Sequence, residues 1–229
     1  MLVLKFGGTS VGSVENMNNV KDIINTKEKK IVVLSAMSGT TNALVNISES
    51  IKNNAIEEAL SAIDHLYKTY TSTIKTLYND ETIEHSVLDF VNTVFRRLGD
   101  AVNKTHTTLL HNTIIAQGEL LSTTIFNRFL NQKGINSQLL PALDFMRIDR
   151  NNEPDNFYIK QNVNRLIDAL PEADIYITQG FICLDADGEL SNLDRGGSDY
   201  TATIIGGALR AKEVQIWTDI DGFHNNCLL

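Results

Sequence analysis

Short apolar runs of strand length alternate along this chain with segments of helical periodicity. The runs are Leu2–Phe6, Ile31–Ala36, Gln138–Leu140, Ile175–Thr178 and Val214–Trp217. Between the first two, apolar residues recur at every third or fourth position, which predicts a helix over Val14–Ile24. Strands joined by crossover helices favour a mostly parallel sheet with helices on both faces. We therefore expect an α/β fold, a three-layer α/β/α sandwich.

Other segments extend this pattern. Residues from about 55 to 111 contain no proline and keep one apolar helical face, which indicates a helical insertion. A helix is expected through Leu44–Ile51 and another over Ile114–Leu130, and a hairpin-like turn over Asp185–Glu189.

Composition limits the classes of function. The chain of 229 residues, 42% of them hydrophobic, predicts one large domain. A net charge of −8 provides no general attraction to nucleic acid or to an anionic membrane. Cys183 and Cys227 are isolated and suggest neither a disulfide framework nor a metal site, which favours a cytoplasmic location. No apolar run has membrane-spanning length and no signal peptide is visible, so we expect no membrane partner.

The first candidate site is the loop that follows Leu2–Phe6. Lys5 carries a positive charge, and Gly7 and Gly8 allow the backbone to approach a phosphate closely. Neither a Walker A loop nor a dinucleotide fingerprint fits the spacing. The alternative is a tight glycine turn with Lys5 extended into solvent.

The second candidate site is the loop that enters a small-residue helix. Arg195 can grip a carboxylate with two hydrogen bonds, Gly196 and Gly197 bring the backbone close, and Ser198 and Asp199 stand near the expected helix N-terminus. Asp199 is alternatively a simple N-cap.

Several other polar residues are interpreted as structural. Without further information, Glu119 is an exposed helix residue. The acidic residues between Asp185 and Glu189 form a turn, because other ligands of a calcium loop are missing. None of the five histidines has metal-ligand spacing, and no protein ligand for a metal is predicted.

Seven motifs appear in an order that resembles the catalytic domain of aspartokinases, in the amino-acid kinase superfamily. They are Lys5-Phe6-Gly7-Gly8-Thr9-Ser10-Val11, Leu34-Ser35-Ala36, Thr41-Asn42, Gln117-Gly118-Glu119, Thr178-Gln179-Gly180-Phe181, Arg195-Gly196-Gly197-Ser198-Asp199-Tyr200-Thr201 and Trp217-Thr218-Asp219-Ile220-Asp221-Gly222. The resemblance spans nearly the whole chain and implies the amino-acid kinase fold.

This resemblance implies ATP-dependent phosphorylation of the side-chain carboxylate of L-aspartate to 4-phospho-L-aspartate, the first step toward lysine, threonine and methionine. It assigns catalytic roles to Lys5, which holds the transferring phosphate, and to Asp199, which orients the lysine charge. It assigns aspartate binding to Thr41, Glu119, Arg195, Gly196, Gly197 and Ser198, and nucleotide binding to Lys5, Phe6, Gly7, Gly8, Thr218 and Asp219. Arg195 takes a substrate carboxylate and Glu119 the ammonium. Mg²⁺ arrives on the ATP phosphates.

The C-terminal residues depart from the family pattern. After Gly222 the family continues with an apolar residue, a tyrosine, Asp-Pro-Arg, a later lysine and two ACT regulatory modules. Here His224 stands at the tyrosine position and Cys227-Leu228-Leu229 stands where Asp-Pro-Arg would be. We expect residues 1–229 to be a catalytic domain that is incomplete at its ATP-binding end, with weak or no activity.

Other interpretations remain open. The chain is alternatively a kinase for a related carboxylate such as glutamate or N-acetylglutamate, or a degenerate aspartate-binding or regulatory subunit. Without ACT modules no regulatory dimer of the family type is expected. An exposed sheet edge makes self-association plausible.

Overall fold

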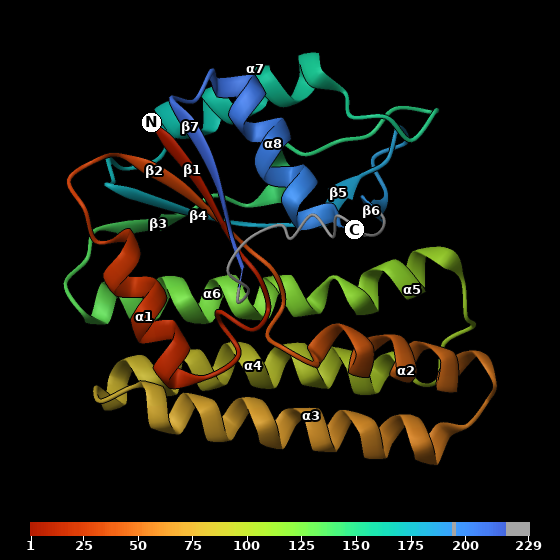
Figure 1. Cartoon of the computed structure of the whole chain (residues 1–229). Coiled ribbons are helices and arrows are strands. Elements are labelled where there is room, and N and C mark those ends of the chain that lie inside the picture. Colours follow the sequence, from red (N-terminus) through yellow and green to blue (C-terminus); the bar gives the residue numbers. More distant parts are fainter. Residues whose placement is uncertain (194–195, 219–229) are drawn as a thin grey trace, which may run out of the picture.

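A five-stranded sheet lies at the centre of the computed structural model, which describes residues 1–193 and 196–218 (Figure 1). The strand order is β3-β4-β2-β1-β7, and every adjacent pair is parallel. The strands are β1 (Leu2–Phe6), β2 (Lys30–Leu34), β3 (Ser137–Leu139), β4 (Ile175–Gln179) and β7 (Glu213–Trp217). The expected α/β fold with a mostly parallel sheet is confirmed.

Alternate side chains of these strands serve two separate cores, because successive residues of a strand point to opposite faces. Val3, Ile31 and Val33 belong to one core, whereas Leu4 and Val32 belong to the other. All five are buried. Burial on both faces explains why β1, β2 and β4 appear in the sequence as nearly continuous apolar runs.

Helices cover both faces (Figure 1). On one side lie α7 (Asn156–Ala169) and α8 (Gly197–Leu209). On the other side lie α1 (Val14–Ile24), α2 (Thr40–Lys52), α3 (Ile56–Leu77), α4 (Glu81–Ala101), α5 (Thr108–Ile115) and α6 (Gln117–Gln132). A single 3₁₀ turn, η1 (Ala142–Asp144), follows β3.

The segment expected to be a helical insertion is a hairpin of two long helices. Helix α3 packs against α2 and α4, and α4 packs against α6, so the hairpin adds a layer outside the helices that touch the sheet. Tyr67 and Tyr70 of α3 both contact the ring of Phe95 in α4, at centroid distances of 5.3 and 5.9 Å. These aromatic contacts join the two helices of the hairpin.

Two elements differ from the sequence-based expectations, and one confirms them. The helix expected over Ile114–Leu130 is in fact two helices, α5 and α6, separated at Ala116. Helix α7 was not predicted, although Asp155 caps it by accepting a hydrogen bond from the Tyr158 N–H at 3.0 Å. The turn after β5 (Ile182–Leu184) leads into β6 (Leu190–Asn192), which confirms the hairpin.

No helix within residues 1–193 and 196–218 combines the length and the apolar character that spanning a membrane requires.

Candidate active site

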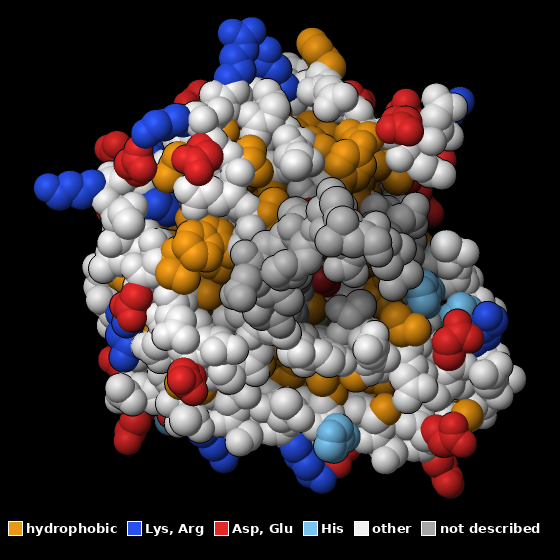
Figure 2. Space-filling model, in the orientation of Figure 1, with side chains coloured by type: hydrophobic (Ala, Val, Ile, Leu, Met, Phe, Trp, Pro, Cys, Tyr) orange, Lys and Arg blue, Asp and Glu red, His pale blue; other side chains and the backbone are white. Residues whose placement is uncertain are grey.

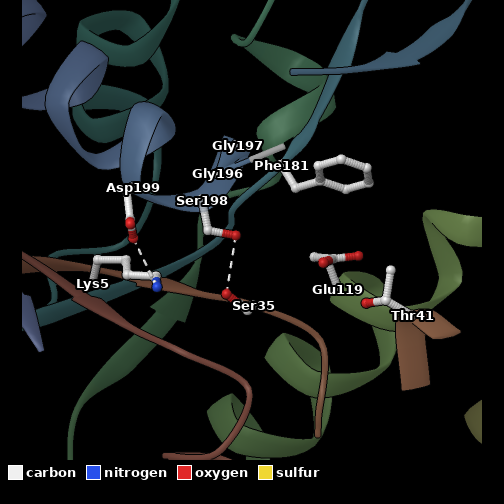
Figure 3. Close-up of a pocket in the computed structure, with 9 residues that line it drawn as sticks. All are labelled: Lys5, Ser35, Thr41, Glu119, Phe181, Gly196, Gly197, Ser198 and Asp199. Atoms are coloured by element: carbon white, nitrogen blue, oxygen red, sulfur yellow. Dashed lines mark hydrogen bonds and ion pairs between the residues drawn. The ribbon is translucent and has the colours of Figure 1, made fainter. Parts of the chain in front are cut away.

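One cavity of about 300 Å³ opens at the carboxyl edge of the sheet. Because all five strands run in the same direction, the loops that follow them meet at this edge. The cavity is lined by Lys5, Ser35, Thr41, Glu119, Phe181, Gly196, Gly197, Ser198 and Asp199. Figure 3 shows Lys5 and Asp199 together on one side of it, and Glu119 and Thr41 on the other.

Lys5 and Asp199 form an ion pair in the cavity wall. The Lys5 Nζ lies 2.7 Å from the Asp199 Oδ1, and the lysine side chain is 13% exposed. The alternative in which Lys5 extends into solvent is therefore wrong. Asp199 is also not an N-cap, because α8 begins after Gly196, which makes no side-chain cap, and the Asp199 carboxylate faces Lys5.

Glu119 is the most unusual group in the cavity. It lies in the first turn of α6 and is 3% exposed, so the alternative of an exposed helix residue is wrong. Its Oε1 accepts a hydrogen bond from the Ala36 N–H at 3.2 Å, and its Oε2 has no partner among the described residues. Burial raises the pKa of the Glu119 carboxyl to about 7, because charging a buried carboxylate is costly.

Two helix N-termini also face the cavity. Thr41 is the second residue of α2, and Gly197 begins α8. The first N–H groups of a helix lack partners within the helix and carry partial positive charge, which favours an anion nearby. The cavity thus combines a lysine and two positive helix ends with one buried carboxylate, a layout that suits a zwitterion with additional negative charge.

Close packing between the start of α8 and the loops that follow β2 and β4 shapes the cavity wall. The Ser35 and Ser198 hydroxyls are hydrogen-bonded at 3.0 Å. A Cβ on Gly180 would collide with the Ser198 side chain and lie 2.8 Å from the Ser198 Cα. A Cβ on Gly197 would lie 2.9 Å from the Phe181 ring. Glycine at these positions allows the loop after β4 to approach the start of α8.

We expect Gly180→Ala to destabilise the fold by about 1 to 3 kcal/mol, because the added methyl group must push the Ser198 backbone away. Urea unfolding measures this effect. Gly207→Ala, in the last turn of α8 with open space around it, is the matched control and should stabilise the protein by about 0.5 to 1 kcal/mol. Equal stability of the Gly180 variant and the parent protein would contradict the close-packing argument.

The residues expected to bind the nucleotide lie in more than one place. A Cβ on Gly7 would lie 3.6 Å from the Lys5 Nζ, so this glycine is next to the cavity. Gly8 approaches the neighbouring loop so closely that a Cβ there would lie 2.7 Å from the Ala36 carbonyl oxygen. Phe6 and Thr218 line a separate hollow of about 200 Å³ beside α1. Arg195 and Asp219 lie outside the described residues.

Two lining residues were not among the expected site residues. Ser35 directly follows β2, and Phe181 follows β4 with a positive φ of 68°. Their positions after parallel strands were the available signal, because such loops form ligand sites. Phe181 also packs against both hydrophobic cores, a contact that no sequence pattern indicates.

The acidic turn is structural, as expected. The Asp185 Oδ1 accepts hydrogen bonds from the N–H groups of Asp187 and Glu189, both at 2.9 Å. Across the described ranges, no group of three or more His, Cys, Asp or Glu side chains could hold a metal ion.

Figure 2 shows basic and acidic side chains interspersed around the periphery of one face, with hydrophobic side chains nearer its middle.

Comparison with known proteins agrees with this architecture. The model of the amino acid kinase family matches residues 1–226. The chain is 33% identical to the lysine-sensitive aspartokinase 3 of Escherichia coli over 98% of its own length, and 34% identical to the chloroplastic aspartokinase 1 of Arabidopsis thaliana over 96%. It spans 50% and 40% of the length of these relatives, respectively.

A solved structure extends the comparison to three dimensions. The crystal structure of E. coli aspartokinase III in complex with aspartate and ADP superposes with a TM-score of 0.82 at 30% identity, covering 97% of this chain and 50% of that one. The resemblance to aspartokinases is thus confirmed over nearly all of the chain. The chain belongs to the amino acid kinase family.

Proposed function

We propose that this chain carries the site of an aspartate kinase, which transfers the γ-phosphoryl group of ATP to the side-chain carboxylate of L-aspartate. A carboxylate oxygen attacks the γ-phosphorus and a new O–P bond forms. The bond between the γ-phosphorus and the bridging oxygen breaks, and the electron pair leaves on ADP. The products are 4-phospho-L-aspartate and ADP.

The observation that carries the proposal is the unpartnered Oε2 of the buried Glu119 at one side of a cavity whose other side holds Lys5. A buried carboxylate needs a cation, and the ammonium group of an amino acid supplies one. Lys5 opposite it can stabilise negative charge on a phosphoryl group. The similarity to a structure of E. coli aspartokinase III in complex with aspartate and ADP supports a site that takes aspartate and a nucleotide.

The proposed mechanism depends on positioning and charge. A substrate carboxylate is already ionised at neutral pH, so no strong general base is required. Phosphoryl transfer mainly needs alignment of the reacting groups and neutralisation of the spreading negative charge. Lys5 provides that charge, and Asp199 holds its Nζ in place through the ion pair.

The remaining assignments belong to the same proposal. Thr41, Gly196, Gly197 and Ser198 line the aspartate end, and Arg195 takes a substrate carboxylate. Phe6, Gly7, Gly8, Thr218 and Asp219 contact the nucleotide. Mg²⁺ is bound by the ATP phosphates. We further propose a cytoplasmic enzyme at the start of lysine, threonine and methionine synthesis.

The test compares three acceptors in an ATP-dependent hydroxamate assay: L-aspartate, L-glutamate and N-acetylglutamate. Calorimetry on the same preparation measures binding of each. We expect aspartate to be preferred and N-acetylglutamate to be rejected, because acetylation removes the cation that the Glu119 carboxylate needs. Preference for either other acceptor would overturn the substrate assignment. Aspartate binding without turnover would instead identify an aspartate-binding subunit.

Aspartate affinity should depend on pH. The folded pKa of Glu119 is raised to about 7, so lowering the pH protonates it and removes the charge that attracts the ammonium group. We expect the affinity to fall about tenfold between pH 8 and pH 6, with release of a proton on binding near pH 7. Calorimetry in buffers of different ionisation enthalpy measures both quantities. A pH-independent affinity would contradict contact between Glu119 and the ammonium.

The same shift has an opposite consequence for the stability of the unliganded protein. Because the folded pKa lies above that of an unfolded glutamate, the stabilising contribution is present at low pH and is lost as the pH rises toward 7. Added aspartate should therefore stabilise the protein most above pH 7, where Glu119 is charged.

A further inference from the structure

A buried tyrosine connects helix α3 of the outer hairpin to the turn beside the cavity. Tyr70 is 0% exposed, and its hydroxyl is hydrogen-bonded to the Thr40 Oγ1 at 3.0 Å. Thr40 is the first residue of α2 and is itself buried, and the next residue, Thr41, lines the cavity. The hydroxyl pair therefore connects the hairpin to the turn that forms one wall of the site.

The start of α2 depends on such a contact because it has no side-chain cap of its own. Its N-cap is Gly39, with φ of 80° and no side-chain hydrogen bond to the helix. Glycine leaves the backbone more freedom than other residues. The Thr40 side chain is held instead from two sides, by the Tyr70 hydroxyl and by the close approach of α6 at Gly118, where a Cβ would lie 3.3 Å from the Thr40 Cγ2.

The same contact lies next to the buried carboxylate. Gly118 precedes Glu119 in α6, so Thr40 is packed against the backbone that carries the carboxylate. Burial raises the pKa of Tyr70 above its ordinary range, and the nearby Glu119 charge adds to this effect. The phenol accordingly stays protonated and keeps its hydrogen bond to Thr40 at every pH at which the pocket functions.

We propose that Tyr70 is a positioning residue of the amino-acid pocket: its hydroxyl fixes Thr40 and thereby holds the first turn of α2, with Thr41, in the geometry that binds substrate. The helical hairpin is then part of the site's support and not only an outer layer. The inference rests on the proposed function insofar as aspartate is the ligand of this pocket.

The test uses Tyr70→Phe, which removes one oxygen and keeps the ring that contacts Phe95. Tyr78→Phe is the matched control, because Tyr78 follows the C-terminal end of the same helix, is 3% exposed, and donates a buried hydrogen bond to the Ile125 carbonyl oxygen. Both variants lose one buried hydrogen bond, so both should have lower melting temperatures. Only Tyr70→Phe should weaken aspartate binding, by about fivefold, with Mg–ATP binding unchanged.

Hydrogen exchange supplies a second measurement that does not require a ligand. Within residues 40–43, the Thr40 and Ala43 amides donate hydrogen bonds to the Met37 and Gly39 carbonyl oxygens. These amides should exchange faster in Tyr70→Phe than in the parent protein, and at the parent rate in Tyr78→Phe. Thr40→Ser retains the hydroxyl and should bind aspartate within about twofold of the parent. Thr40→Val should match Tyr70→Phe, and combining the two should cause no further loss if they act through one hydrogen bond.

The outcomes separate the inference from the function. If the parent chain does not bind aspartate, the proposed function fails. Independently of that result, unchanged exchange at residues 40–43 in Tyr70→Phe would overturn the positioning role. If aspartate binds but Tyr70→Phe and Tyr78→Phe have equal affinities, the function stands and Tyr70 is only structural. A selective loss of aspartate affinity together with faster exchange supports the positioning role.

Discussion

In an active, C-terminally extended form of the chain, Lys5→Ala should lower the rate of phosphoryl transfer about 100- to 1,000-fold while changing aspartate affinity by less than about threefold. The Lys5 charge is held 2.7 Å from the Asp199 carboxylate at the side of the cavity away from Glu119. A fixed charge in that position contributes most when negative charge spreads over the transferring phosphoryl group. In the proposed site the substrate's ammonium and α-carboxylate bind away from Lys5, so aspartate binding should largely survive.

The measurement combines turnover in the hydroxamate assay with calorimetry for aspartate and Mg–ATP. Mg–ATP binding should weaken about tenfold, because a charge-assisted contact with a phosphate is lost. Lys212→Ala is the matched control: this lysine also forms an ion pair, with Glu28 at 2.9 Å, but it is exposed and lies beside Met1 at the opposite edge of the sheet. Equal losses of aspartate affinity and turnover in Lys5→Ala would refute a phosphate role.

Glu119→Gln should weaken aspartate binding about 10- to 100-fold, because it replaces a charge-assisted hydrogen bond to the ammonium with a neutral one. The substitution keeps the shape of the side chain and an oxygen that can accept from the Ala36 N–H. It also removes the cost of burying a charge, so the unliganded variant should be at least as stable as the parent at pH 8.

Calorimetry from pH 6 to pH 8 checks this prediction together with thermal unfolding. The pH dependence of aspartate affinity should disappear in Glu119→Gln, because glutamine does not titrate. Glu153→Gln, an exposed carboxylate outside the cavity, serves as the control and should retain the parent's pH profile. If Glu119→Gln bound aspartate as tightly as the parent and with the same pH profile, Glu119 would not be the ammonium ligand.

Strands β1, β2 and β4 were largely predictable from the sequence because they are buried on both faces. Residues 2–6, for example, form a continuous apolar run except for Lys5, and the structure has β1 at those bounds. Helix boundaries were less predictable. Helical periodicity continues through Ala116, and only the packing of α5 and α6 against different neighbours decides where one helix ends and the next begins.

Helix α7 was overlooked although its sequence indicates it. Its buried residues, Ile159 and Val163, are four positions apart, and Leu166 and Ile167 continue this spacing and pack against the same core. Its N-cap, Asp155, also forms a salt bridge with Arg147. The helix is amphipathic, and its contact with α8 adds stabilisation from tertiary packing.

The sequence by itself determined the α/β architecture, the order of the motifs and the two glycine-containing loops of the site. These features depend on apolar periodicity and backbone conformation, which residues close together in the chain determine. Only the tertiary structure decided which side chains of the site are buried and which form ion pairs. The sequence permitted an exposed Glu119 and a capping Asp199. Packing α6 under the β2–α2 loop buries Glu119, and packing α8 against β1 places the Asp199 carboxylate beside Lys5. Burial, pKa and ion pairing depend on residues far apart in the chain, and the contact of Tyr70 with Thr40, thirty positions away, arises in the same way.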